Sequence, residues 1–220
     1  MKKGLTEVVF ILDRSGSMQG LEADTIGGFN SLLEKQKKEE GEAVLTTVLF
    51  DDKVETLYDR VDLREAKNMT EKEYFVRGCT ALLDAIGSTV HAVGKKQKEL
   101  PEEERPEKTL FIITTDGMEN ASREYNHAKV KKMIEKKKSK HGWEFLFLGA
   151  NIDAVKVAGN FGIAANRAVN YKCDKAGTAH NFATLAKTVG AFRNAKSRED
   201  EELCMVECCA SISADYEARK

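Results

Sequence analysis

The 220-residue sequence has little proline and no excess of charge of either sign. It contains two prolines, and 35 Lys and Arg residues face 36 Asp and Glu residues, for a net charge of −1. A general nucleic-acid coat would need a clear basic excess, so the balance argues against one. No apolar run approaches the roughly 18 residues of a membrane span, and residues 8–12 are shorter than the h-region of about 7–15 residues in a secretory signal. We therefore expect neither a nucleic-acid partner nor a membrane partner.

The five cysteines are odd in number and unevenly spread. Without an export signal, this usage predicts reduced thiols and a cytoplasmic location. Cys204, Cys208 and Cys209 could suggest zinc, but no histidine or further cysteine pair lies near them. The sequence instead favours an apolar helix face. Its expected members are Leu203, Val206, Cys209 and Ala210.

Strand-like and helix-like segments alternate along the chain. The expected strands are 8–12, 43–50, 54–58, 110–113, 143–148 and a weak one at 168–171. The expected helices are 21–40, 80–98, 124–140, 153–160 and 177–196. A short turn at Asp51-Asp52 joins two of the strands as a hairpin, and both prolines fall in the loop that contains residues 101–106. This alternation predicts an α/β fold with a mostly parallel central sheet.

Polar residues follow the buried strands where a parallel sheet collects its ligands, at the carboxyl ends. Asp13, Ser15 and Ser17 follow the first strand, Thr80 precedes a helix, and Asp116 follows the strand at 110–113. All five offer oxygen, and none is histidine or cysteine. Oxygen ligands are the preference of a hard cation such as Mg²⁺, Mn²⁺ or Ca²⁺. The sequence therefore predicts a metal site at this edge.

The same residues form three recognisable motifs. An Asp-x-Ser-x-Ser motif begins at Asp13, a Gly-x-Thr-x-Leu motif contains Thr80, and an Asp-Gly pair begins at Asp116. Together they resemble the metal-ion-dependent adhesion site of von Willebrand factor A domains, and the sequence looks most like small stand-alone members of bacterial or phage type. The order of the motifs, as well as their presence, matches the family.

The resemblance implies a doubly wound, Rossmann-like, three-layer α/β/α fold. It implies about six mostly parallel strands with one antiparallel edge strand, over residues 5–196, while residues 197–220 are expected to form an acidic C-terminal tail or a short helix. It further implies that Ser15, Ser17 and Thr80 bind the metal directly, and that Asp13 and Asp116 often act through waters. Mg²⁺ is the expected ion, with Mn²⁺ or Ca²⁺ as alternatives.

The function implied by the resemblance is protein interaction without catalysis. In the family, the metal accepts a Glu or Asp side chain from a partner protein. Because small bacterial members often work beside AAA-type ATPases, such an ATPase is a candidate partner. Electrostatic recognition of this kind mainly sets specificity and register, so a surrounding contact surface must supply the remaining affinity.

Other interpretations of the same residues remain open. The chain could be a magnesium-dependent phosphohydrolase with Asp13 as nucleophile, although position 15 is Ser and offers no second carboxylate for acid–base catalysis. The site could also be vestigial, and Asp13 to Ser17 alone could be a turn with a helix cap. The lysine-rich stretch 129–140, interrupted by Glu135, fits a solvated helix face or a surface that touches phosphates.

Overall fold

Residues 1–219 are described by a computed structural model, in which six strands form one sheet of order β3-β2-β1-β4-β5-β6. Strand β3 runs antiparallel to β2, and the other neighbouring pairs are parallel. The antiparallel edge strand is therefore as predicted. The strands are β1 (Lys2–Asp13), β2 (Glu42–Phe50), β3 (Val54–Asp62), β4 (Pro106–Thr115), β5 (Glu144–Gly149) and β6 (Ala168–Asn170).

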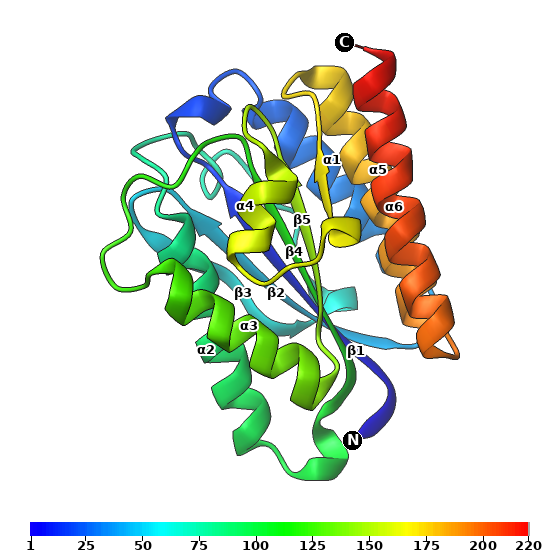
Figure 1. Ribbon diagram of the computed structural model, residues 1–220. Coiled ribbons are helices and arrows are strands. Elements are labelled where there is room, and N and C mark those ends of the chain that lie inside the picture. Colours follow the sequence, from blue (N-terminus) through cyan, green and yellow to red (C-terminus); the bar gives the residue numbers. More distant parts are fainter. Residues whose placement is uncertain (220) are drawn as a thin grey trace.

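Helices cover both faces of the sheet (Figure 1). They are α1 (Glu22–Gln36), α2 (Leu82–Glu99), α3 (His127–His141), α4 (Ala154–Asn160), α5 (Lys175–Asn194) and α6 (Arg198–Ala218). One core cluster joins the sheet to α1, α5 and α6, and a second joins it to α2, α3 and α4. The predicted three-layer, Rossmann-like architecture is confirmed. None of the helices described combines the length and apolar character that crossing a bilayer requires.

Strand β1 is the centre of the core because both of its faces are covered. Successive side chains of a strand point to opposite faces. Phe10 and Leu12 accordingly pack in the cluster of α1 and α5, whereas Val9 and Ile11 pack in the cluster of α2 and α3. All four are buried. This double burial explains why the strand appears in the sequence as a continuous apolar run.

The strand order creates a switch point between β1 and β4. From β1 the chain passes to β2 and β3 on one side, and it later returns to β4 on the other side of β1. In open α/β sheets, loops that leave the carboxyl ends of the strands diverge at such a point and form a crevice. Asp13 ends β1, and Asp116 directly follows β4. The topology thus brings two sequence-distant carboxylates to one place.

Three strands are longer than the sequence indicates. One of them, β4, spans Pro106–Thr115, so the prediction that both prolines lie in a loop is wrong for Pro106, which begins the strand. Strand β1 begins at Lys2, where it pairs with Pro106, and β3 continues to Asp62, which pairs with Val44. Polar side chains are frequent in the extensions of β1 and β3. An edge strand such as β3 leaves one side open to water, so backbone pairing can continue without an apolar run.

Where the sequence predicts an acidic tail or a short helix after residue 196, the structure has the 21-residue helix α6. A capping box between Ser197 and Asp200 begins it. The domain boundary expected at residue 196 stays a prediction.

The apolar face predicted for this segment is wrong at three of its four positions. Leu203 is 56% exposed and Val206 is 40% exposed, and Ala210 is also exposed. The buried stripe instead has the three-and-four spacing of one helix face. Its members are Cys204, Met205, Cys208, Cys209 and Ile212.

Candidate metal site

The five predicted ligands converge at the carboxyl edge of the sheet. Thr80 Oγ1 donates a hydrogen bond to Ser15 Oγ at 3.1 Å, and the hydroxyl oxygens of Ser15 and Ser17 lie 3.2 Å apart. Ser17 Oγ donates to Asp116 Oδ1 at 2.5 Å. Asp13 joins through the backbone of Ser15, whose N–H donates to Asp13 Oδ1 at 2.7 Å. Three separate loops therefore contribute to one continuous set of oxygen atoms.

Asp13 is held as a buried carboxylate behind the hydroxyl groups. It is 2% exposed, and Thr115 Oγ1 donates to its second oxygen, Oδ2, at 2.6 Å. Burial raises the pKa of Asp13 to about 6, although hydrogen bonds from Thr115 and Ser15 lower it. Burial likewise raises the pKa of Asp116, against the hydrogen bond from Ser17. The site therefore holds two carboxylates for which burial opposes the charged form.

This donor set fits a hard divalent cation. Its atoms are hydroxyl and carboxylate oxygens, and a cation beside them would offset the cost of two buried negative charges. Among residues 1–219, no cluster of three or more His, Cys, Asp and Glu side chains forms a metal site. A candidate centre based on serine and threonine hydroxyls is thus consistent with the chemistry of the chain.

Gly117 allows the loop after β4 to pass close to the hydroxyl groups. A Cβ atom at this position would lie 3.2 Å from Thr80 Oγ1 and 3.3 Å from Ser17 Oγ. These distances are tighter than almost all real Cβ contacts. A side chain here would therefore compete with the hydroxyls for the space between the two loops.

An ion-pair network with a buried centre at Arg14 and Asp51, which the sequence analysis missed, supports the loops of the site. Arg14 Nε donates to Asp51 Oδ2 at 2.8 Å, and Arg77 Nε donates to the same oxygen at 2.8 Å. Glu55 also pairs with both guanidinium groups. The ring of Phe75 lies 5.2 Å from the Arg14 guanidinium carbon and 5.0 Å from that of Arg77. This cluster fixes the turn between β2 and β3 against the segment that leads to Thr80.

Backbone contacts continue the support toward the ligands. Arg77 N–H donates to the Arg14 carbonyl at 3.0 Å, and Gly16 N–H donates to the Gly78 carbonyl at 3.2 Å. Gly78 adopts a positive φ of 67°, and a Cβ atom there would lie 2.2 Å from Asp52 Oδ1. Only glycine fits this conformation at little cost. The glycine of the Gly-x-Thr-x-Leu motif is therefore required by the turn before Thr80.

The loop after β4 also positions the start of α2. Asn120 Oδ1 accepts the backbone N–H of Thr80 at 2.9 Å, and Glu119 Oε2 accepts that of Leu83 at 2.7 Å. The first N–H groups of a helix have no partner within the helix, so Glu119 supplies one. Sequence reasoning missed both residues. Their closeness to Asp116 in the chain was the only available signal.

Cys173 is a further neighbour of the site that the sequence did not reveal. Its thiol lies 3.5 Å from Asp116 Oδ2. Burial first, and then the negative charge of Asp116, raise the pKa of this thiol to about 12. Cys79, which is adjacent to Thr80 in the sequence, is exposed instead. The cysteine that contacts a predicted ligand therefore comes from the loop after β6.

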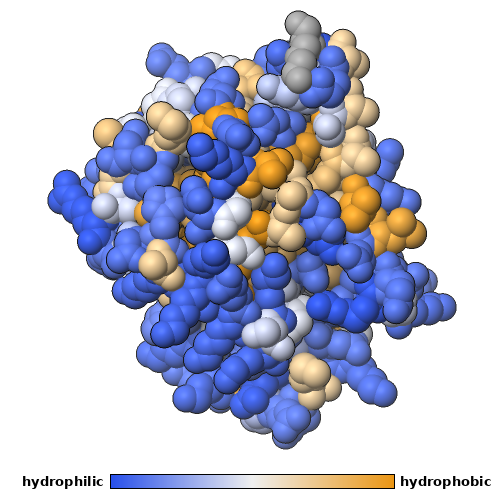
Figure 2. Space-filling view, viewed as in Figure 1, coloured by the Kyte–Doolittle hydropathy of each residue, from blue (hydrophilic) through white to orange (hydrophobic). Residues whose placement is uncertain are grey.

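The surface around this edge combines an exposed apolar side chain with a hollow. Met118, two residues after Asp116, is 72% exposed. Beside it lies a hollow of about 450 Å³, whose lining includes Met118, Ile152, Tyr171 and Cys173. In the space-filling view, orange apolar residues gather in the upper half of the face shown, whereas the lower left is hydrophilic (Figure 2).

Comparison of the sequence with known protein families finds no match, and comparison with curated proteins finds none either. Solved structures do match the fold, and among them are von Willebrand A domains. The chain therefore has a von Willebrand A-like fold, with the six-stranded sheet and flanking helices described above.

Three of these structures are representative. A von Willebrand factor type A protein from Catenulispora acidiphila has a TM-score of 0.58 and 15% identity, over 84% of this chain and 42% of that one. Proximal thread matrix protein 1 from the mussel byssus, with a zinc-occupied adhesion site, has a TM-score of 0.55 and 15% identity, over 84% and 46%. Manganese-loaded TRAP protein from Plasmodium vivax has a TM-score of 0.51 and 20% identity, over 68% and 59%. The chain thus spans less than two thirds of the length of each.

Proposed function

We propose that this protein is a metal-dependent interaction module. Ser15, Ser17 and Thr80 would hold a divalent cation together with Asp13 and Asp116, and a carboxylate of a partner protein would complete its coordination. The observation that carries the proposal is the convergence of three hydroxyls and the Asp116 carboxylate, each within 3.2 Å of the next. Two of the structural neighbours support a divalent ion, since one has a zinc-occupied adhesion site and the other is manganese-loaded.

The chain's own residues favour an external carboxylate as the remaining ligand. The three hydroxyls are neutral, and both Asp13 oxygens already accept hydrogen bonds from Ser15 and Thr115. A bound cation would supply an electrophilic position, and few negative charges of the protein would neutralise it. Met118 and the neighbouring hollow offer the contact area that a single metal–carboxylate bond needs around it.

A thermal melt tests the metal site. We expect Mg²⁺ or Mn²⁺ to raise the melting temperature of the wild type over that in chelator, because a ligand that binds only the native state stabilises it. Asp116→Ala should abolish this rise. The control Glu103→Gln removes one exposed acidic charge in the turn that precedes β4, at the opposite end of the strands, and should respond like the wild type. An unchanged metal response in Asp116→Ala would overturn the assignment.

A pull-down tests the partner interaction. Capture by the wild type should require a divalent cation, and chelator or Asp116→Ala should abolish it. Binding that persists in chelator would show that a partner uses another surface. An AAA-type ATPase is the first candidate to test, on the strength of the sequence resemblance alone.

The phosphohydrolase alternative is less well supported by the placement of Asp13. A nucleophilic carboxylate needs an accessible oxygen, whereas this side chain is buried and both of its oxygens accept hydrogen bonds. Turnover of p-nitrophenyl phosphate by purified protein with Mg²⁺, stopped by Asp13→Asn, would reverse this preference.

A further inference from the structure

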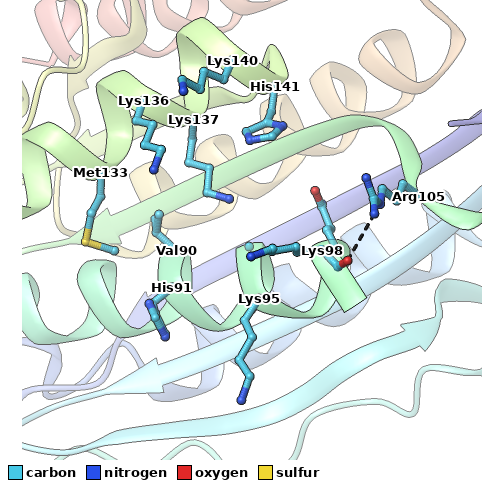
Figure 3. A pocket seen from close by; sticks show the side chains of 12 residues that line it. Val90, His91, Lys95, Lys98, Arg105, Met133, Lys136, Lys137, Lys140 and His141 are labelled. Atoms are coloured by element: carbon cyan, nitrogen blue, oxygen red, sulfur yellow. Dashed lines mark hydrogen bonds between the residues drawn. The ribbon is translucent and has the colours of Figure 1, made fainter. Parts of the chain in front are cut away.

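A groove of about 740 Å³ lies between α2 and α3, near the carboxyl ends of the two helices. Figure 3 shows the side chains from both helices that line it, with those of His91 and Lys95 on α2 pointing away from α3. Six of the residues that line it carry a full positive charge. These are Lys95, Lys98, Arg105, Lys136, Lys137 and Lys140. We call these six residues and the space between them the basic groove.

The positive charge of the basic groove is only partly balanced by nearby acidic side chains. Neither Asp nor Glu occurs among the described residues that line it, although acidic residues outnumber basic ones in the whole chain. Lys95 lies 3.9 Å from Glu99. For Lys136, Lys137 and Lys140, the structure records no ion pair within residues 1–219. The concentration of charge is therefore a property of this place, not of the composition.

Burial and, after it, the crowding of positive charge lower the pKa of two groups in the groove. Lys137 is half-buried, with its ammonium 4.3 Å from the centre of the Trp143 ring. Burial, and then Lys136, lower the pKa of Lys137. Burial also lowers the pKa of His141, and neighbouring cations, Lys137 first, lower it further. An anion between the two helices would relieve this repulsion.

The groove combines one fixed cation, flexible cations and an apolar floor. The Arg105 guanidinium is held by hydrogen bonds to the carbonyls of Leu100 at 3.0 Å and Lys98 at 3.2 Å. Lys136 and Lys137 extend from α3 toward α2 (Figure 3). Val90 and Met133 contribute apolar surface between them. A planar guanidinium beside several ammonium groups suits phosphate oxygens, which accept several hydrogen bonds at once.

We propose that the basic groove binds a small ligand carrying two or more phosphate groups. Its volume lies within the range of small-molecule sites. An acidic turn, Glu102–Glu104, lies in the chain between α2 and Arg105, and it would repel a long polyanion that ran beyond the groove. The candidate metal site lies at the opposite end of α2, where Thr80 precedes the helix. Anion binding in the groove and metal binding at the sheet edge can therefore be tested independently of each other.

Calorimetric titration with inorganic triphosphate tests the proposal, with chelator present so that no metal carries the ligand to the other site. We expect saturable binding to the wild type that weakens as salt rises. Lys137→Gln/Lys140→Gln should weaken it at least about tenfold, as expected for the loss of two charge-assisted contacts. The control Lys35→Gln/Lys38→Gln removes the same charge from exposed positions at the carboxyl end of α1, on the other face of the sheet, and should bind like the wild type.

Circular dichroism should first establish that both double variants are folded. ATP, titrated in parallel, should bind at least as tightly as triphosphate. Tighter binding of ATP would indicate that its adenine base contacts the apolar surface of Val90 and Met133. Absence of triphosphate binding at millimolar concentration, or equal affinity in both double variants, would overturn the proposal. So would a single-stranded oligonucleotide of about 20 residues that binds far more tightly than triphosphate, because its many phosphates would indicate an extended surface.

Discussion

At the scale of single residues, the predicted metal ligands depend on a neighbouring side chain that is not itself a ligand. Arg14 lies between Asp13 and Ser15 in the motif, yet its side chain turns away from the hydroxyls and pairs with Asp51 in the interior. Both partners are buried. Although burial raises the pKa of Asp51, hydrogen bonds from Arg77, the Lys53 backbone and Arg14 hold it below its usual value. The carboxylate therefore stays charged and needs its cations.

Arg14→Met should destabilise the protein by up to about 3–5 kcal/mol, the usual cost of breaking a buried ion pair, because Asp51 would keep only the partly exposed Arg77 as its cation. Urea unfolding measures this loss. Arg77→Met removes a cation that pairs with the same carboxylate but is partly exposed, so it should cost clearly less. Equal losses in the two variants would contradict a buried, structural role for Arg14.

Asp13 predicts a pH dependence in metal-free protein. Its pKa in the native state is raised to about 6 from an ordinary value of 3.8, so between these values the native state holds more protons than the unfolded state. Its contribution to stability is then present at low pH and is lost as pH rises from about 4 to 6. Relative to Asp13→Asn, the wild type should lose about 2–3 kcal/mol over this range.

Unfolding in chelator at pH 4 and at pH 7 measures this difference, and the comparison with Asp13→Asn cancels the other titrating groups. A divalent cation should make the wild type more stable than Asp13→Asn at pH 7, because the cation favours the charged carboxylate. A wild type and variant that respond identically to pH would contradict the burial of a titrating Asp13.

At the scale of elements, helix α6 shows how tertiary packing decides which of two possible helix faces is buried. Leu203 and Val206 are more hydrophobic than the cysteines near them, which made them attractive as core residues. The helix instead buries Cys204 and Cys208, which share a face with Met205 and Ile212. The deciding factor is the match of that stripe to the surface of α5 and the sheet, which local hydrophobicity does not report.

Met205→Ala should therefore cost about 2–5 kcal/mol, because it deletes a fully buried side chain and leaves a cavity. Leu203→Ala, two positions earlier and more than half exposed, should change stability by at most about 0.5 kcal/mol. Chemical denaturation of the two variants provides the measurement. A larger loss of stability in Leu203→Ala than in Met205→Ala would show that α6 packs against the core with the face that contains Leu203.

At the scale of the whole molecule, the sequence was informative where function depends on local spacing and on strand ends. Asp13, Ser15 and Ser17 share one loop, and a buried parallel strand points its carboxyl end to the ligand edge whatever its neighbours are. Thr80 and Asp116 lie in other loops, but motif order and sheet topology bring them to the same place. The convergence of the five residues could thus be expected before any coordinates existed.

The remaining features depend on contacts between distant segments. Arg14 and Asp51 are 37 positions apart, and nothing in either loop indicates that they meet. The lysines of α3 resemble any solvated helix face until α2 and Arg105 are placed opposite them. Strand β3 continues past the predicted end because β2 offers it backbone partners. Pairings of this kind are tertiary, so a single sequence does not encode them in its local pattern.

The placement of the two ends of the chain has a practical consequence. The first residues of β1 and the last turn of α6 lie at opposite ends of the molecule (Figure 1). Arg219 pairs with Asp174, the neighbour of Cys173, whose thiol contacts Asp116. A sensor surface or bead attached ahead of Met1 would therefore present the metal edge to the solution, whereas attachment through the other end would bring the support up against it. The orientation of the immobilised protein would then decide whether an acidic partner could reach the site at all.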